Sequence, residues 1–361
     1  MQNYPPNWSE GLFLRPQHFQ SADRYWHELI SLSSHMDGGF NYGLFALEIN
    51  HEALKNQVLE VVRCQARTKD GTLVSFESGS IDRVDLAEKL ESDPSFTEML
   101  RENNGLLVYL AIPQLKLTRP NIAEQRSPNG RTSRYVGLNK QFEDESTGDN
   151  PQEVSVRELN ATIQFESDDL SGFERVPLFR MRRSQGAQLV LERDPEYVAP
   201  CLNTQAVDLL QRNFMEAAYD TLKSRSDLLS RQVNDAGITF STQTAGAVDR
   251  LMKLQSINQG LAALHCHSFA AGVHPYVAYA TLCQIVGHLS VFGDEKRIGD
   301  MPHYDHENLH FIFQWVLHRI QQLVEIDDSG MHQIYFKGSG GNRLQVRLQP
   351  QWFSRDWKII L

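Results

Sequence analysis

The spacing of apolar residues changes once along this chain of 361 residues, at residues 194–200. Before this segment, short apolar or alternating runs are separated by turn residues, which is typical of β-strands. After it, apolar residues recur at nearly helical spacing, which is typical of amphipathic helices. The sequence therefore predicts an α+β chain with a β-rich first part and a helical second part.

The β-rich part is predicted from several short strands. The clearest candidates are residues 40–49, 57–66, 72–76, 105–115, 153–159, 161–166, 176–182 and 188–192. Asp70 and Gly71 lie between two of them and predict a hairpin, because glycine accepts the positive φ of a tight turn. Many short strands at this spacing favour a β-sandwich, which we assign to residues 1–198. Residues 119–150, rich in Asn, Ser, Gly and charge, predict a long irregular excursion.

The second part predicts a four-helix bundle over residues 199–328. Helices are expected at about 203–233 and 245–269, from Pro275, and after about Asp305. Short connections favour antiparallel neighbours. The side chains expected to pack within the bundle or between copies of it are Leu210, Phe214, Leu251, Leu254, Leu282, Ile285, Ile312, Phe313, Val316 and Ile320.

Residues 329–361 predict a return to β-structure. Strands are expected at 331–337, 343–348 and 356–361, with a glycine-rich turn at 338–341. A lone hairpin with one further strand is marginal in water. We therefore expect these residues to be the beginning of a β-rich domain whose remainder is absent from this sequence.

Composition narrows the class of protein. An apolar content of 41% is enough for two or three domains with cores of their own. A formal charge of −10 and a pI near 5.7 argue against nucleic-acid binding, which needs a basic face. The sequence contains no secretory signal, no apolar run long enough to insert into a membrane and no CxxC spacing. We expect a soluble cytoplasmic protein with reduced thiols.

An apolar segment close to the amino terminus is unusual, because termini usually fray. Its candidate partner-binding residues are Trp8, Leu12, Phe13, Leu14, Pro16, His18 and Phe19. These side chains either staple the first strand to the core or form a docking surface, and large aromatic anchors favour docking. We interpret His18 as a structural histidine rather than a proton carrier.

Residues 8–20, WSEGLFLRPQHFQ, followed by DRY at 23–25, resemble the opening signature of the TssK-type (VasE or ImpJ) baseplate subunits of the bacterial type VI secretion system. The segments DPEYVAPCL at 194–202, HPYVAY at 274–279 and YDHENL at 304–309 resemble patterns at matching places in that family. The resemblance covers essentially the whole chain.

The resemblance implies an architecture and a set of partners. Family members are trimers with a β-sandwich shoulder related to phage receptor-binding proteins, a helical neck and a β-rich head. The shoulder meets the wedge proteins TssF and TssG. A complete head reaches the cytoplasmic regions of TssL and TssM at the inner membrane, and this sequence ends a short way into that domain.

A histidine cluster offers an alternative, a metal-dependent hydrolase using His303, His306 and His310. Offsets of three and four residues would align these imidazoles on one helix, as in metal sites. However, Pro302 and Asp305 place His303 before the helix, so it would not share the face. No nucleophile elbow is present either. We expect a non-enzymatic scaffold with no catalytic residue, metal or cofactor.

Overall fold

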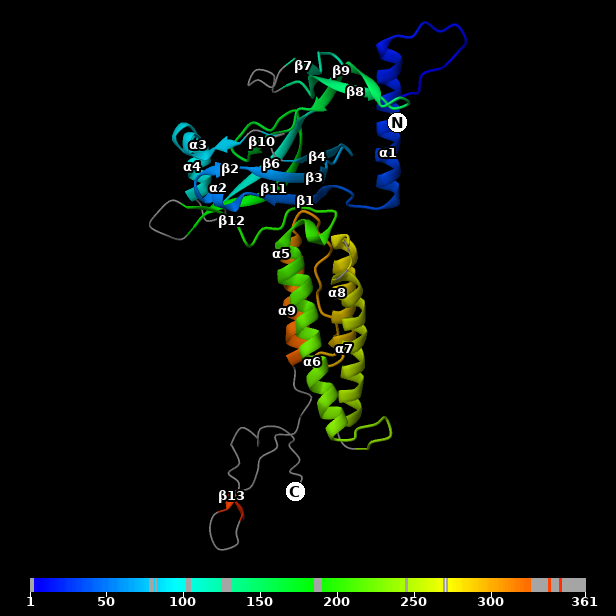
Figure 1. Cartoon of the computed structure of the whole chain (residues 1–361). Helices are drawn as coiled ribbons and strands as arrows, with labels where there is room; N and C mark the ends of the chain where they lie inside the picture. Colours follow the sequence, from blue (N-terminus) through cyan, green and yellow to red (C-terminus); the bar gives the residue numbers. More distant parts are fainter. Residues whose placement is uncertain are drawn as a thin grey trace.

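The computed structural model describes residues 3–77, 81, 83–101, 105–124, 132–184, 190–243, 246–268, 270, 272–325, 337–338 and 344–345. A β-rich part lies at one end of the molecule, and long helices extend away from it (Figure 1). The prediction of a mixed chain with helices and several sheets is confirmed.

Two antiparallel sheets supply much of the buried surface of the β-rich part. One has the order β1-β3-β4 and the other β10-β6-β11-β12. Their bounds are β1 Gly43–Ile49, β3 Val61–Arg67, β4 Leu73–Glu77, β6 Leu106–Pro113, β10 Thr162–Phe165, β11 Phe173–Arg183 and β12 Leu191–Arg193. In β4, Val74 and Phe76 are buried while their neighbours are exposed, which is the alternation of a half-buried strand. The inward residues of both sheets belong to one core cluster.

The β3–β4 hairpin is present where Asp70 and Gly71 predicted it. Arg67 pairs with Leu73, and Gly71 adopts a φ of +86°. Thr68 N–H donates to the carbonyl of Thr72 at 3.0 Å and closes the turn. The local chemistry of the turn therefore fixes the register of both strands.

The prediction of β-structure up to about residue 198 is wrong for several segments, which form short helices. These are α2 His51–Lys55, α3 Leu86–Ser92 and α4 Pro94–Arg101, beside the small β2 (Val58–Leu59) and β5 (Val84–Asp85) pair. In α4, Phe96 is buried edge-on against Phe165, with ring centroids 5.1 Å apart. Helices of this length carry too few turns for helical periodicity to stand out in the sequence.

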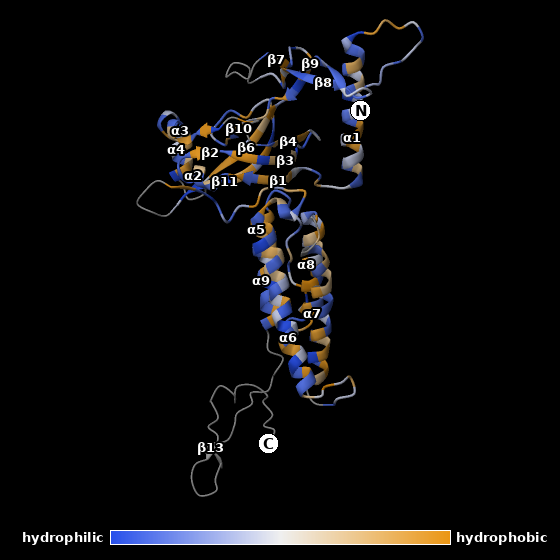
Figure 2. Ribbon diagram, in the orientation of Figure 1, coloured by the Kyte–Doolittle hydropathy of each residue, from blue (hydrophilic) through white to orange (hydrophobic). Residues whose placement is uncertain are grey.

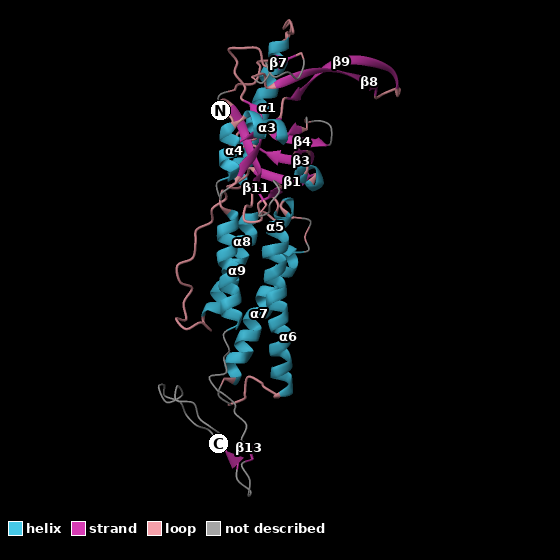
Figure 3. Ribbon diagram, turned by 90° about the vertical axis from the view of Figure 1, so that its left-hand side faces the viewer, coloured by secondary structure: helices cyan, strands magenta, loops and turns pink. Residues whose placement is uncertain are grey.

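The described residues of 119–150 also differ from the irregular excursion that was predicted, because strands occupy much of them. β8 (Tyr135–Asp144) and β9 (Asp149–Leu159) form a long antiparallel hairpin, with β7 (Ile122–Ala123) parallel to the start of β8. The hairpin projects from the sheets, and most of its outer residues are exposed on both faces (Figure 3). A strand exposed on both faces has no alternating apolar pattern, so its composition resembled that of a loop.

The helical part begins with a change of helix type. One helix over 203–233 was predicted here. The structure instead has four successive elements, namely a 3₁₀ turn (η2, Thr204–Ala206), α5 (Asp208–Leu210), a π-helical turn (η3, Gln211–Glu216) and α6 (Ala217–Asp235). The next helices are α7 Ala247–Ser268, α8 Pro275–Ser290 and α9 Leu309–Glu325. α6 packs on α7 and α9, and α8 packs on the same two helices.

The sheets and the helices are joined through β1. Leu44 N–H donates to the carbonyl of Pro200 at 2.9 Å, and Leu202 N–H donates to the carbonyl of Leu44 at 2.7 Å. Gly43 has a φ of +116°, and a Cβ there would collide with Pro200. This close approach requires glycine.

Beyond the helices, β13 (Lys337–Gly338) pairs with β14 (Leu344–Gln345). The rest of the strands and the turn predicted at 331–361 lie outside the described residues. Among the helices that the structure describes, none is long and apolar enough to cross a membrane.

Candidate docking surface

The amino-terminal signature leads into a helix, α1 (Pro16–Asp37), rather than into a strand. Pro16 occupies the start of the helix, where its missing N–H is not needed. His18 Nδ1 accepts a hydrogen bond from Arg15 N–H at 3.1 Å, so this histidine caps the first turn. The expectation of β-structure was wrong here because Pro16 and His18 are helix-start signals placed inside an apolar run.

The predicted docking residues are mostly exposed. The exposed fractions are 53% for Trp8, 78% for Phe13, 55% for Leu14 and 54% for Phe19, and Pro16 is exposed too. Leu12 and His18 are half-buried. The Trp8 ring lies 6.1 Å from that of His18 and 6.3 Å from that of Phe19, between ring centroids. The segment therefore folds onto the first turn of α1 and leaves most of its apolar surface uncovered.

The exposed apolar surface continues along α1. None of the 22 residues of this helix is buried by the described part of the chain. Phe19, Trp26 and Ile30 are exposed and lie on one face, because they are seven and four residues apart. We call these three residues the α1 stripe. In Figure 2, α1 stands beside the β-rich part with apolar and polar residues mixed along it. Large exposed apolar side chains on one face of a helix make that face a candidate interaction surface.

Polar contacts hold α1 against the rest of the protein. Asp23 pairs with Arg157 of β9 at 3.0 Å. Ser31 Oγ donates to the carbonyl of Asp70 at 3.2 Å, and Asn41 Nδ2 donates to the carbonyl of Ser34 at 2.8 Å. Exposed contacts of this type each contribute little stability. They orient the helix without covering its apolar stripe.

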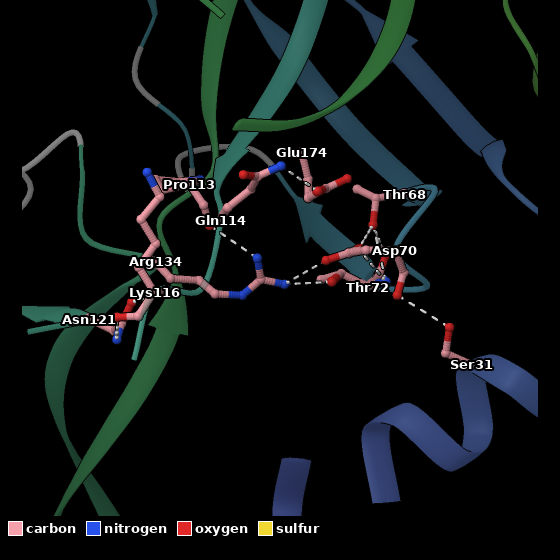
Figure 4. A network of polar contacts seen from close by, with 10 residues as sticks. All are labelled: Ser31, Thr68, Asp70, Thr72, Pro113, Gln114, Lys116, Asn121, Arg134 and Glu174. Atoms are coloured by element: carbon pink, nitrogen blue, oxygen red, sulfur yellow. Dashed lines mark hydrogen bonds and ion pairs between the residues drawn. The ribbon is translucent and has the colours of Figure 1, made fainter. Parts of the chain in front are cut away.

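A buried arginine organises the turn on which α1 rests (Figure 4). The Arg134 guanidinium donates to the carbonyl of Pro113 at 3.0 Å and to Thr72 Oγ1 at 2.6 Å. It also lies 3.4 Å from Asp70 Oδ2. Burial of Asp70 opposes its ionisation, but hydrogen bonds from Thr68 and Thr72 and the charge of Arg134 hold its pKa below the usual range.

Arg134 thereby ties separate elements together. It immediately precedes β8, so it anchors the base of the exposed hairpin to the end of β6 and to the start of β4. The carbonyl of Asp70, in the same turn, accepts a hydrogen bond from Ser31 of α1. One polar network therefore contacts both the amino-terminal helix and the base of the β8–β9 hairpin.

The histidine cluster proposed as a metal site is dispersed in the structure. His306 is only 1% exposed, and its Nε2–H donates to the carbonyl of Tyr42 at 2.9 Å. His303 is exposed, and His310 lies edge-on to Phe214 at 5.5 Å between ring centroids. Within the described residues, no group of three His, Cys, Asp or Glu side chains could hold a metal ion. The hydrolase alternative therefore has no support.

Most of the predicted bundle residues are buried. They are Leu210, Phe214, Leu282, Ile285, Ile312, Phe313, Val316 and Ile320. Leu251 and Leu254 are half-buried, and α7 also buries Ile257 and Leu264. A Cβ at Gly260 would lie 2.9 Å from Ile285 of α8, so the two helices approach closely at this glycine.

The contacts between distant segments escaped sequence reasoning. Tyr42 and His306 are separated by 264 residues, and Arg134 and Thr72 by 62. No local pattern marks either pair. In the segments HPYVAY and YDHENL, Pro275 and Asp305 predicted helix starts, but nothing in either segment predicted a contact with residues 40–42.

Comparison with known proteins gives one consistent family. The family model described as "Bacterial Type VI secretion, VC_A0110, EvfL, ImpJ, VasE" matches residues 18–361. The "Type VI secretion system baseplate component TssK1" of Pseudomonas aeruginosa is 27% identical over 320 residues, which are 87% of this chain and 67% of that protein.

Solved structures share the fold. A crystal structure of TssK superposes with a TM-score of 0.77 at 21% identity, over 90% of this chain and 73% of that chain. A chain of the baseplate complex of the type VI secretion system gives 0.76 at 24% identity, and one of a TssK–TssF–TssG baseplate subcomplex gives 0.73 at 23%. In both, 90% of this chain and 100% of the other chain are covered. Because the family model spans nearly the entire sequence, this chain belongs to the VasE (ImpJ) family of bacterial type VI secretion proteins.

Proposed function

We propose that this chain is a structural subunit of a type VI secretion baseplate and acts by binding other proteins. The observation that carries the proposal is α1, a helix of 22 residues with no residue buried by the described chain and an apolar stripe facing outward. A surface of this kind needs a protein partner. A relative is named as a baseplate component, and similar folds occur in a TssK–TssF–TssG subcomplex.

The proposed partners of the amino-terminal surface are the wedge proteins TssF and TssG. Trp8 and Phe19 are large and exposed, with ring centroids 6.3 Å apart, and the exposed Phe13 lies in the segment just before α1. Aromatic side chains of this kind are the commonest anchors of protein interfaces. Leu12, Leu14, Pro16 and His18 complete the proposed surface.

The proposed domain roles follow the family. Residues 1–198 form the β-sandwich shoulder, residues 199–328 the four-helix neck, and residues 329–361 the start of the head. Support comes from the core shared by the two larger sheets and from the packing of α6, α7, α8 and α9 on one another. We further propose that the neck aligns three copies as a homotrimer. Light scattering should then give a trimer mass, and a monomer at every concentration would contradict it.

We also propose an adaptor role at the cytoplasmic face of the inner membrane. A complete head would link the wedge to TssL and TssM, while the chain itself does not insert into the membrane. Separate pull-downs with the wedge proteins and with the cytoplasmic regions of TssL and TssM test the wedge contact and the membrane-complex contact independently. Binding of the wedge proteins without binding of TssL or TssM would contradict the membrane end of this proposal for this chain.

The docking proposal has a direct test. Replacing Leu12 and Phe13 by Asp should abolish co-purification with TssF and TssG, because two charges would enter an apolar interface. The core should remain folded, since Phe13 is 78% exposed and the half-buried Leu12 lies outside the core cluster. Phe240→Asp is a matched control, because Phe240 is 75% exposed but lies in the α6–α7 connection. Unchanged co-purification of the Leu12 and Phe13 variant would defeat the docking claim.

A further inference from the structure

Two histidines of the helical part hold the segment that joins α1 to β1. His274, at the start of α8, has its Nε2 3.2 Å from the carbonyl of Phe40. His306, just before α9, has its Nε2 2.9 Å from the carbonyl of Tyr42. Carbonyl oxygens only accept, so both Nε2 atoms carry hydrogen. The two imidazoles are stacked nearly parallel, at 6° and 5.7 Å between centroids.

The second nitrogen of each ring is occupied as an acceptor. Tyr276 N–H donates to His274 Nδ1 at 3.1 Å, so this imidazole is the N-cap of α8. Tyr304 OH lies 2.7 Å from His306 Nδ1 and donates to it when the ring is neutral. A proton on His274 Nδ1 would face the Tyr276 N–H and place a positive charge at a helix N-terminus. The arrangement therefore requires a neutral His274 and favours a neutral His306.

The segment that the two histidines contact, residues 40–42, is conformationally strained at Phe40. Phe40 has a φ of +60°, a conformation that bulky residues rarely adopt. Its ring packs against Tyr304 at 4.8 Å, His306 at 5.5 Å and Tyr276 at 6.3 Å between centroids. Strain of this kind persists only where the surroundings over-determine the backbone. The strain at Phe40 therefore favours a different backbone conformation of this segment once its hydrogen bonds to the two imidazoles are broken.

We propose that His274 and His306 form a proton-sensitive clamp on residues 40–42, which fixes α1 and the β-rich part on the helices and opens when either imidazole is protonated. The clamp uses two motifs, HPYVAY and YDHENL, that the docking function leaves unexplained. It concerns the joint itself and does not depend on which protein binds α1.

The surroundings set the direction of the pH response. The titratable groups around the pair are Tyr42, Lys69, Cys201, Tyr304, Asp305 and Glu307. Burial lowers the pKa of both His274 and His306 below the usual 6.5. The hydrogen bonds from Nε2–H to the carbonyls of Phe40 and Tyr42 favour the charged forms, but burial outweighs them. Glu307 favours the charged form of His306, but this carboxylate is paired with Lys69 at 2.6 Å and accepts from Tyr42 OH at 2.7 Å. The released histidines bind protons more readily than the clamped ones, so the clamp is strongest above pH 6.5 and weakens as the pH falls below it.

Hydrogen exchange of the full chain at pH 7.5 and pH 5.5, corrected for the intrinsic pH dependence of exchange, tests the clamp. The reporters are the amides of Leu44 and Leu202, which bond across the joint, and the reference is Leu110 in β6. Because the pKa of both histidines is lower in the clamped state than in the released state, protection at the joint should be lost as the pH falls. We expect a several-fold loss at both reporters at pH 5.5 and no change at Leu110.

Variants separate the clamp from ordinary packing. His274→Asn keeps an N-cap oxygen and His306→Gln keeps a polar side chain, but neither titrates. The double variant should give low protection at the joint at both pH values, with Leu110 unchanged. His303→Asn, an exposed histidine of the same loop, should respond like the wild type.

Two results would overturn the clamp. One is equal wild-type protection of Leu44 and Leu202 at the two pH values. The other is a double variant that keeps the full wild-type pH response. If the double variant loses protection at Leu110 as well, the single variants decide, because each should reduce the pH response.

Discussion

Helices α1 and α9 both carry large apolar side chains, yet they are used in opposite ways. α9 buries seven of its 17 residues, among them Phe313 and Ile320, against α6 and α8. α1 is longer, with 22 residues, and the described chain buries none of them. Apolar content therefore predicts burial only where the same chain provides a second surface. In α1 the apolar side chains remain available to another polypeptide.

The largest expected effect is on the free energy of unfolding, and it distinguishes a substitution in α9 from one in α1. Phe313→Ala removes a buried ring that contacts Phe214 at 6.0 Å and Tyr279 at 5.7 Å between centroids. It should lower the free energy of unfolding by about 3–5 kcal/mol. Phe19→Ala in the α1 stripe should change it by less than about 0.5 kcal/mol. Urea denaturation followed by circular dichroism measures both. Equal losses would mean that α1 is part of the core in solution.

A second prediction compares the polar contacts that position α1. Arg134→Ala leaves the carbonyl of Pro113 and the hydroxyl of Thr72 without their buried partner and should cost about 2–3 kcal/mol. Arg157→Ala removes the exposed pair with Asp23 and should cost less than about 1 kcal/mol. The same denaturation curves give both values. A small loss for Arg134→Ala would show that the network in Figure 4 does not organise this turn.

A third prediction, with a smaller effect than Phe313→Ala or Arg134→Ala, concerns the point where α1 touches the β3–β4 turn. Gly71 has a φ of +86°, and a Cβ there would collide with Ser31 of α1. Gly71→Ala should therefore destabilise by about 1–2 kcal/mol, through backbone strain and the displaced helix. Gly148→Ala at the hairpin tip has a φ of +68° but no atom within 4 Å of the added Cβ, so it shows the cost of strain alone. Thermal unfolding that gives equal shifts for both variants would mean that α1 does not rest on Gly71.

The same contrast explains what could be predicted from the sequence. α7, α8 and α9 bury one face, so their spacing located them closely. The β3–β4 hairpin followed from Asp70 and Gly71. The β8–β9 hairpin buries little against this chain, so its sequence lacks the alternation that packing imposes. In α1, Phe19, Trp26 and Ile30 do recur at helical spacing, and the prediction of β-structure for this part of the chain overlooked it.

The candidate site was only partly predictable for the same reason. Trp8, Phe13 and Phe19 stand out as aromatic residues near a terminus, and their exposure fits the docking hypothesis. The network of Arg134 and the clamp at His274 and His306 depend on contacts between distant segments. Only the three-dimensional structure brings these together.

Hydrogen exchange of α1 in the free chain and in the presence of TssF and TssG shows whether the amino-terminal surface docks. Amides at the start of α1, around Phe19, should exchange readily in the free chain and become strongly protected in the complex. The amides of α9 should not change. Unchanged exchange across α1 in a verified complex would contradict docking through the amino-terminal surface.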